Sequence, residues 1–207
     1  MSSIIVFGIG FLAQALFSSR IILQWIISEK NKKMLTPRLF WELSLLASFL
    51  LFIYGYLRDD FAIMLGQVIT YYIYIRNMQL EHVWAKLPRL MQIFLYLFPV
   101  IILTYGFNNN IVDRENLFNF EHISSSLMAL GVIAQILFTL RFVYQWVYSE
   151  KRKKSHLPMG FWVLSLVGSS LILIYAIFRL DPVLILGNSS GVVVYSRNIY
   201  ILKKYGE

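Results

Sequence analysis

Two arginines interrupt long apolar stretches of this sequence. Arg20 and Arg141 each stand about nine residues from the nearest basic loop, which is about 13 Å along a helix. A charged residue at that depth of a membrane costs a few kcal/mol and therefore needs a partner. Because a guanidinium binds phosphate through two parallel hydrogen bonds, the arginines could receive an anionic ligand. The structural alternative is that they snorkel or bind helix carbonyls.

Further polar residues gather on single faces of the first and third helix of each repeat when the apolar stretches are drawn as helices. Small and polar side chains on one face, with aliphatic side chains elsewhere, are typical of a bundle with a wetted or ligand-lined interior. The predicted substrate-binding residues are Arg20, Gln24, Gln67, Tyr74, Arg76, Asn77, Arg141, Gln145, Asn188, Tyr195, Arg197 and Asn198.

Structural roles compete with binding at several of these positions. Glu42 is a candidate carboxylate partner for Arg20, whereas the corresponding position in the second half of the chain is Val163. Arg76 and Arg197 could serve only as positively charged anchors at the membrane surface. The residue types alone do not choose between anchoring and binding.

The candidate residues occur in pairs because the sequence is duplicated. Residues 10–77 and 131–198 align without a gap at a distance of 121 positions. About 40% of the paired positions are identical, which identifies a true internal repeat. Duplicated membrane segments are how many transporters are built.

The composition indicates a membrane protein. Hydrophobic residues make up 58% of the chain and the mean hydropathy is +0.63, which excludes an ordinary soluble globule. The net charge of +8 comes from short basic clusters between apolar runs, a pattern typical of membrane topology and not of nucleic-acid binding. With no cysteines, the chain has no disulfide, thiol nucleophile or thiolate metal site. The first apolar run lacks a basic region before it, so no cleavable signal peptide is expected.

Seven apolar stretches are long enough for bilayer-spanning helices, which need about 20 residues each. We therefore predict an all-α integral membrane protein. Residues 1–80 form a first three-helix repeat, residues 81–126 a linker with the fourth transmembrane helix and an outer loop, and residues 127–207 a second three-helix repeat. The predicted spans are 4–27, 39–57, 61–79, 90–107, 127–148, 160–178 and 182–201.

The basic loops predict how these helices are oriented. With seven spans all four basic clusters fall on one side, which the positive-inside rule assigns to the cytoplasm. The N-terminus is then outside and the C-terminus cytoplasmic. Because one helix separates the repeats, both point the same way across the membrane. The clusters are Lys30 to Arg38, Lys86 with Arg89, Lys151 to Lys154, and Lys203 with Lys204.

Duplicated tryptophans and glycines carry structural predictions. The tryptophans are expected at the membrane interface, where this residue is enriched, and the glycines where helices approach closely. The residues are Trp25, Trp41, Trp146 and Trp162, and Gly10, Gly66, Gly131 and Gly187.

Both halves carry the same series of motifs: Gly-x-x-x-Gln, then Arg-x-x-x-Gln-Trp-x-x-Ser-Glu-Lys, then Pro-x-x-Phe-Trp-x-x-Ser, and finally Tyr-x-Arg-Asn. They resemble the lipid A biosynthesis N-terminal domain, a branch of the PQ-loop, MtN3 and SWEET-like transporter superfamily. The resemblance implies a 3+1+3 fold, a bacterial inner-membrane location and a role in envelope lipid or lipid-linked sugar metabolism. It also implies substrate contacts at Asn77 and Asn198. Leu23 and Tyr144 precede the glutamines where the PQ-loop pattern has proline.

From the resemblance and the polar faces we predict a transporter or flippase, not an enzyme, with no cofactor. It would translocate a phosphate-bearing lipid-linked sugar or envelope lipid intermediate by alternating access. One alternative is a SWEET-like carrier of a neutral soluble sugar, and another is a non-transporting membrane subunit of an envelope glycosyltransferase. The expected partners are a membrane lipid or lipid-linked sugar and that glycosyltransferase, with no nucleic acid. No metal-binding or nucleophile motif appears in the sequence.

Overall fold

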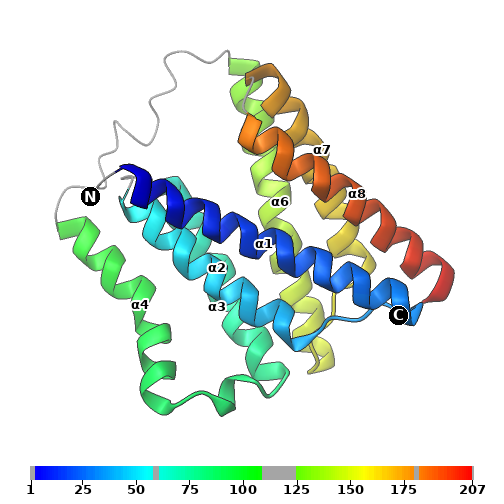
Figure 1. Ribbon diagram of the computed structural model, residues 1–207, viewed down its shortest axis with the longest axis horizontal. Helices are drawn as coiled ribbons and strands as arrows, with labels where there is room; N and C mark the ends of the chain where they lie inside the picture. Colours follow the sequence, from blue (N-terminus) through cyan, green and yellow to red (C-terminus); the bar gives the residue numbers. More distant parts are fainter. Residues whose placement is uncertain (1–2, 58–60, 109–124, 180–181, 207) are drawn as a thin grey trace. The chain divides into compact units, whose positions relative to one another are not determined.

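The computed structural model describes residues 3–57, 61–108, 125–179 and 182–206 (Figure 1). Within these ranges every regular element is a helix, which confirms the predicted all-α class. The elements are α1 (Ser3–Asn31), α2 (Arg38–Leu57), α3 (Phe61–Leu80), η1 (Trp84–Lys86), α4 (Arg89–Asn108), α6 (Ser125–Arg152), α7 (Met159–Arg179) and α8 (Pro182–Tyr205). The predicted outer loop, at residues 109–124, lies outside the described residues.

Each predicted span coincides with one described α-helix to within a few residues at either end. The 3+1+3 arrangement and the division of the chain after residues 80 and 126 stay predictions. Arg89–Thr104 in α4 is a shorter apolar helix. Four described helices are long and apolar enough to cross a membrane: Ile4–Asn31, Arg38–Leu57, Ala129–Arg152 and Met159–Phe178.

The first helix of each repeat ends in the same turn. Lys32 and Lys153 take left-handed backbone conformations, with φ of 48° and 51°. In each turn the following amide donates to the carbonyl five residues earlier, that of Ser28 in α1 and Ser149 in α6, at 3.2 and 3.3 Å. This closure is a Schellman motif, which satisfies carbonyls that a helix end leaves open. The next helices, α2 and α7, each begin directly after a proline, where a missing amide hydrogen removes no helix bond.

The chain forms two compact units that do not coincide with the sequence repeats. The first unit contains Met1–Arg20 and Arg38–Asn119, and the second contains Ile21–Pro37 and Phe120–Glu207. The boundary therefore falls inside α1. The C-terminal part of α1 belongs to the same unit as α6, α7 and α8, although its sequence belongs to the first repeat.

In the first unit an aromatic cluster joins α4 to α2. The ring centroid of Phe98 in α4 lies 4.3 Å from that of Phe49 and 5.7 Å from that of Phe52, both in α2. Figure 1 shows α4 bent part-way along its length, and Pro99 lies inside this helix. A proline removes a backbone hydrogen bond and so explains the bend.

The same helix covers one face of α3. The hydroxyls of Tyr71 and Tyr72 donate to the backbone carbonyls of Leu95 and Tyr96 in α4, at 3.0 and 2.9 Å. Tyr71 is fully buried as a result. In the second unit, α7 packs against both α6 and α8 (Figure 1).

Two of the duplicated glycines allow the close approach that the sequence predicts. A Cβ added to Gly10 would lie 2.8 Å from the ring of Tyr54, and one added to Gly131 would lie 2.9 Å from the ring of Tyr175. At Gly66 an added Cβ would meet no described atom within 4 Å, so close packing does not explain this glycine. The surroundings of the fourth duplicated glycine, at position 187, lie outside what the structure describes.

Candidate functional site

Arg20 of α1 lies among aromatic rings and is only 3% exposed. Its guanidinium carbon is 4.6 Å from the ring centroid of Phe17 and 5.0 Å from that of Phe40 in α2. Tyr74 of α3 adds a third ring at 5.2 Å. Ring faces within about 6 Å of a cation attract it, so three helices contribute to holding this charge. The Nη1 atom of Arg20 also donates a hydrogen bond to the Ser44 hydroxyl of α2.

Arg141 of α6 has equivalent surroundings and is 4% exposed. The ring centroids of Phe138 and Phe142 lie 3.4 and 4.6 Å from its guanidinium carbon. Phe161 of α7 and Tyr195 of α8 follow at 5.6 and 5.7 Å. Its Nη1 donates to the Tyr195 hydroxyl at 3.1 Å. The structure thus brings Arg20 together with Tyr74, and Arg141 together with Tyr195.

Two sequence predictions about these surroundings need correction. Glu42, the candidate partner of Arg20, is exposed on α2. The interfacial location predicted for Trp41 and Trp162 is wrong, because both are fully buried. The ring centroids of Trp41 and Tyr74 lie 6.2 Å apart, and those of Trp162 and Tyr195 lie 6.1 Å apart. Each tryptophan therefore packs against the arginine cage, the set of aromatic rings around Arg20 or Arg141. Trp146 is 41% exposed, as an interfacial residue would be.

Gln24, one turn beyond Arg20, braces the turn that follows α1. Its Nε2 donates to the Ser28 hydroxyl at 2.9 Å and to the Leu35 carbonyl at 3.3 Å. The Ser28 hydroxyl in turn accepts the Leu35 amide at 3.1 Å. Since these atoms are inside the protein, the brace satisfies backbone groups that a tight turn would otherwise leave without partners.

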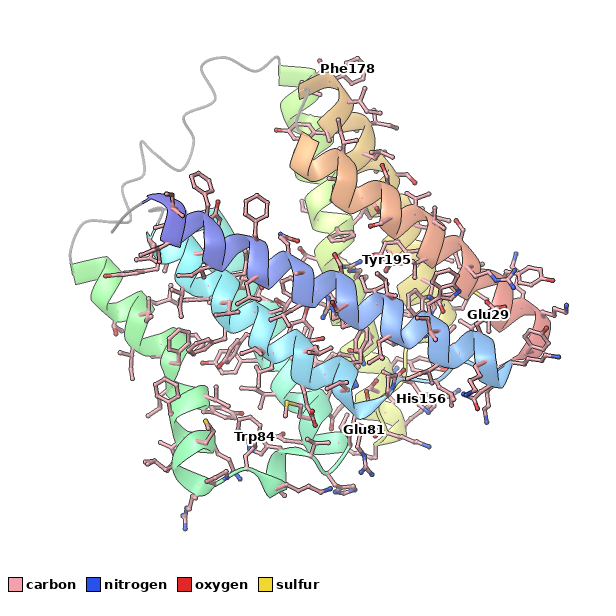
Figure 2. The ribbon with its side chains drawn as sticks, in the orientation of Figure 1. Glu29, Glu81, Trp84, His156, Phe178 and Tyr195 are labelled. Carbon is pink, nitrogen blue, oxygen red and sulfur yellow. The ribbon has the colours of Figure 1, made fainter. Side chains whose placement is uncertain are left out.

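The second repeat contains the same brace. Gln145 Nε2 donates to the Ser149 hydroxyl at 2.8 Å and to the His156 carbonyl at 3.0 Å. The Ser149 hydroxyl accepts the His156 amide at 3.1 Å. Figure 2 labels His156 at this turn. The duplicated Gln-x-x-x-Ser spacing therefore has a structural explanation.

Gln24 also joins two distant parts of the sequence. Asn198 Nδ2 of α8 donates to Gln24 Oε1 at 3.1 Å, and Gln24 Nε2 donates to Asn198 Oδ1 at 3.3 Å. Both residues are fully buried. This reciprocal pair fixes the C-terminal part of α1 to α8 within the second unit.

Near this pair, a surface ion pair joins the same two helices. Arg197 Nε donates to Glu29 Oε2 at 2.8 Å, and its Nη2 donates to Glu29 Oε1. The two side chains are 43% and 39% exposed. Figure 2 shows Glu29 beside the C-terminal half of α8.

The remaining predicted residues lie on the third helix of each repeat. Gln67 Oε1 accepts the Ser48 hydroxyl of α2 at 2.9 Å, and Asn188 Oδ1 accepts the Ser169 hydroxyl of α7 at 3.2 Å. These two bonds are equivalent in the repeats and tie each third helix to its second helix.

Two predicted residues of α3 make contacts along their own helix. Arg76 Nη1 donates to Gln79 Oε1 at 3.1 Å. Asn77 is fully buried, and its Nδ2 donates to the Ile73 carbonyl at 2.9 Å.

Sequence reasoning named the two tyrosines beside the arginines but missed the phenylalanines, and the serine that Arg20 bonds to, as site residues. Phe17 and Phe40 recur as Phe138 and Phe161, and Ser44 recurs as Ser165. Their identity across the repeats was a usable signal, but apolar rings in an apolar helix do not stand out. Within the described ranges, no three His, Asp or Glu side chains gather to hold a metal ion.

These features define a class: a helical protein of membrane type with an internally duplicated, hydrogen-bonded polar interior. The family model of the Lipid A Biosynthesis N-terminal domain matches residues 9–79 and again residues 130–200. The chain belongs to this family. Its two matches follow the internal repeat.

Several relatives carry the name lipid-A-disaccharide synthase. The one from Chlamydia pneumoniae is 29% identical over 205 residues, which cover 97% of this chain and 34% of the relative. The one from Chlamydia felis is 27% identical over 209 residues, and that from Chlamydia trachomatis serovar D is 25% identical over 208 residues. The chain spans about a third of the length of these relatives. No solved structure matches it significantly.

The relatives overturn two predictions made from the sequence. They are named for an enzyme of lipid A biosynthesis, which contradicts both the transporter or flippase function and the prediction that the chain is not an enzyme. The alternative of a membrane subunit of an envelope glycosyltransferase agrees better with their names. The transporter prediction relied on the polar helix faces, but buried polar residues can either line a transport pathway or bond helices together. In this chain many of them bond helices or turns.

Proposed function

We propose that this chain is the membrane part of a lipid-A-disaccharide synthase, or of an assembly with that activity. Its helices would hold the enzyme at the membrane and keep an acylated sugar substrate within reach. The glycosyl-transfer part would come from further sequence of the same polypeptide or from a partner chain. The observation that carries the proposal is that relatives with this name align over 97% of the chain while the chain spans only a third of them.

We also propose that the seven α-helices in the described part of the chain span the bacterial inner membrane in a 3+1+3 arrangement. The last turns of α1, α6 and α8 carry basic residues, which supports a cytoplasmic location for these ends. These helix ends would then leave the membrane on the cytoplasmic side, where soluble glycosyl donors are found.

Nine of the predicted substrate-binding residues would divide into two groups. Eight of the twelve are buried, among them both deep arginines, and the arginines bond to side chains of neighbouring helices. We assign these eight to holding the helices in place. Arg197 is exposed, and we assign it to contact with the lipid.

The test is the rate of lipid-A-disaccharide formation in membranes from cells depleted of this chain, compared with cells in which it is restored. We expect depletion to lower the rate and the restored chain to recover it. An unchanged rate on depletion would overturn the proposal. Affinity purification of the tagged chain then decides whether the transfer domain is covalently attached or a separate partner.

A further inference from the structure

A shallow apolar groove lies between the C-terminal part of α1 and α8. It is widely open and has a volume of about 540 Å³. All of its lining residues belong to the second unit. They are Trp25, Val192, Val193, Ser196, Arg197 and Tyr200.

The groove has an apolar end and a cationic end. Val193 and Tyr200 are seven residues apart on α8, which is about 10 Å along a helix. The valines lie at one end, whereas Arg197 and Tyr200 lie toward the basic C-terminus of α8, which ends in Lys203 and Lys204. An acyl lipid with an anionic headgroup has the same order of apolar and charged parts. Basic pockets between membrane helices are known sites for such headgroups.

Arg197 presents the chemical group that recognises phosphate. A guanidinium offers two parallel donors, and Nε and Nη2 of Arg197 use this fork on the Glu29 carboxylate. Trp25 Nε1 also donates to Glu29 Oε2, at 3.3 Å. Glu29 therefore occupies the position on Arg197 that a phosphate would take, and the two anions would compete.

The first repeat differs at the equivalent surface. The counterparts of Val192 and Val193 are Tyr71 and Tyr72, whose hydroxyls bond to α4. Val193 is 62% exposed instead. In the first unit, α4 thus covers this surface. In the second unit, the corresponding surface of α8 is exposed and available to a lipid.

We propose that the groove binds one phosphate-bearing acyl lipid, with its chain along Val192 and Val193 and its phosphate on Arg197 in place of Glu29. The inference depends on the membrane location in the proposed function but not on any glycosyl-transfer activity. Lipid binding by the purified chain is therefore measured separately from that activity, and either proposal can fail alone.

The experiment is a titration of the purified, delipidated chain with phosphatidic acid, followed by native mass spectrometry, with phosphatidylcholine as the zwitterionic comparison. We expect Arg197→Gln to weaken phosphatidic acid binding about tenfold or more, because it removes a charge-assisted bond. We expect Glu29→Gln to strengthen binding several-fold because it removes the competing carboxylate. Val193→Trp, which fills the groove, should weaken binding of the acyl chain.

Matched controls separate the groove from general charge and hydrophobicity. Arg152→Gln removes an exposed arginine from α6, and Val167→Trp enlarges an exposed valine on α7. Neither should change binding. If the Arg197 and Glu29 variants both weaken binding, the pair is only structural and the proposal is wrong. It is equally wrong if Arg152→Gln acts as strongly as Arg197→Gln, or if phosphatidylcholine binds as well as phosphatidic acid. Thermal unfolding of each variant confirms that the proteins compared are folded.

Discussion

The helices α3 and α8 are repeats of one sequence that share their contact with an arginine and differ on their outer surfaces. On the inner side, Tyr74 and Tyr195 face equivalent arginines in both. On the outer side, the two tyrosines of α3 bond to α4, whereas the corresponding valines of α8 line an exposed groove. The comparison shows that duplication has kept the contacts made inside the helix bundle, since each of those residues depends on a partner. The outer surfaces have diverged because each meets a different neighbour.

The largest expected effect tests whether the two arginine cages are equivalent. We expect Arg20→Ala and Arg141→Ala each to lower the free energy of unfolding by about 3 kcal/mol, because each leaves a cavity and removes cation–π contacts. Reversible unfolding in mixed micelles, followed by tryptophan fluorescence, measures this. Arg152→Ala, on the exposed face of α6, serves as the control and should change little. A large effect at one arginine and none at the other would show that the cages have different roles.

The next prediction tests the contact through which α1 meets α8. We expect Gln24→Leu and Asn198→Leu each to lower the free energy of unfolding by about 2 kcal/mol, because each leaves a buried amide without its partner. The double variant should lower the free energy of unfolding by about 1 kcal/mol less than the sum of the two single effects, because the two residues are in direct contact. Strict additivity in this double-mutant cycle would argue against a direct bond.

A smaller effect is expected where the exteriors differ. Tyr71→Phe should lower the free energy of unfolding by about 1 kcal/mol, because it removes the hydrogen bond to the Leu95 carbonyl of α4. Val193→Phe, on the exposed surface of α8, should change it by less than about 0.5 kcal/mol. If both variants lower the free energy of unfolding by the same amount, the contact with α4 does not distinguish the outer surface of α3 from that of α8.

The smallest effect on stability is expected at the ion pair. Arg197→Gln and Glu29→Gln should each leave the free energy of unfolding almost unchanged, since exposed pairs contribute little. Thermal unfolding at low and high salt checks this. A clear loss of stability in either variant would give the pair a structural role instead of the headgroup role proposed for Arg197.

Part of the polar interior could be predicted from sequence, and part could not. That Arg141 needs a partner was expected from its depth, because a buried charge is costly without one. The identity of that partner was not predicted, since Tyr195 lies 54 positions away in the sequence. The role of Gln145 was also missed, because its bond to the His156 carbonyl depends on a turn whose backbone carries no side-chain signal.

The sequence by itself determined the duplication, the positions of the helices and their membrane character. These depend on apolar runs and on local signals such as a proline before a helix, which act within a few residues. Only the tertiary structure decided that α1 is divided between two units and that Gln24 and Glu29 meet α8. Those contacts join residues 174 and 168 positions apart, and helical periodicity specifies which face a residue lies on but not which distant helix that face meets.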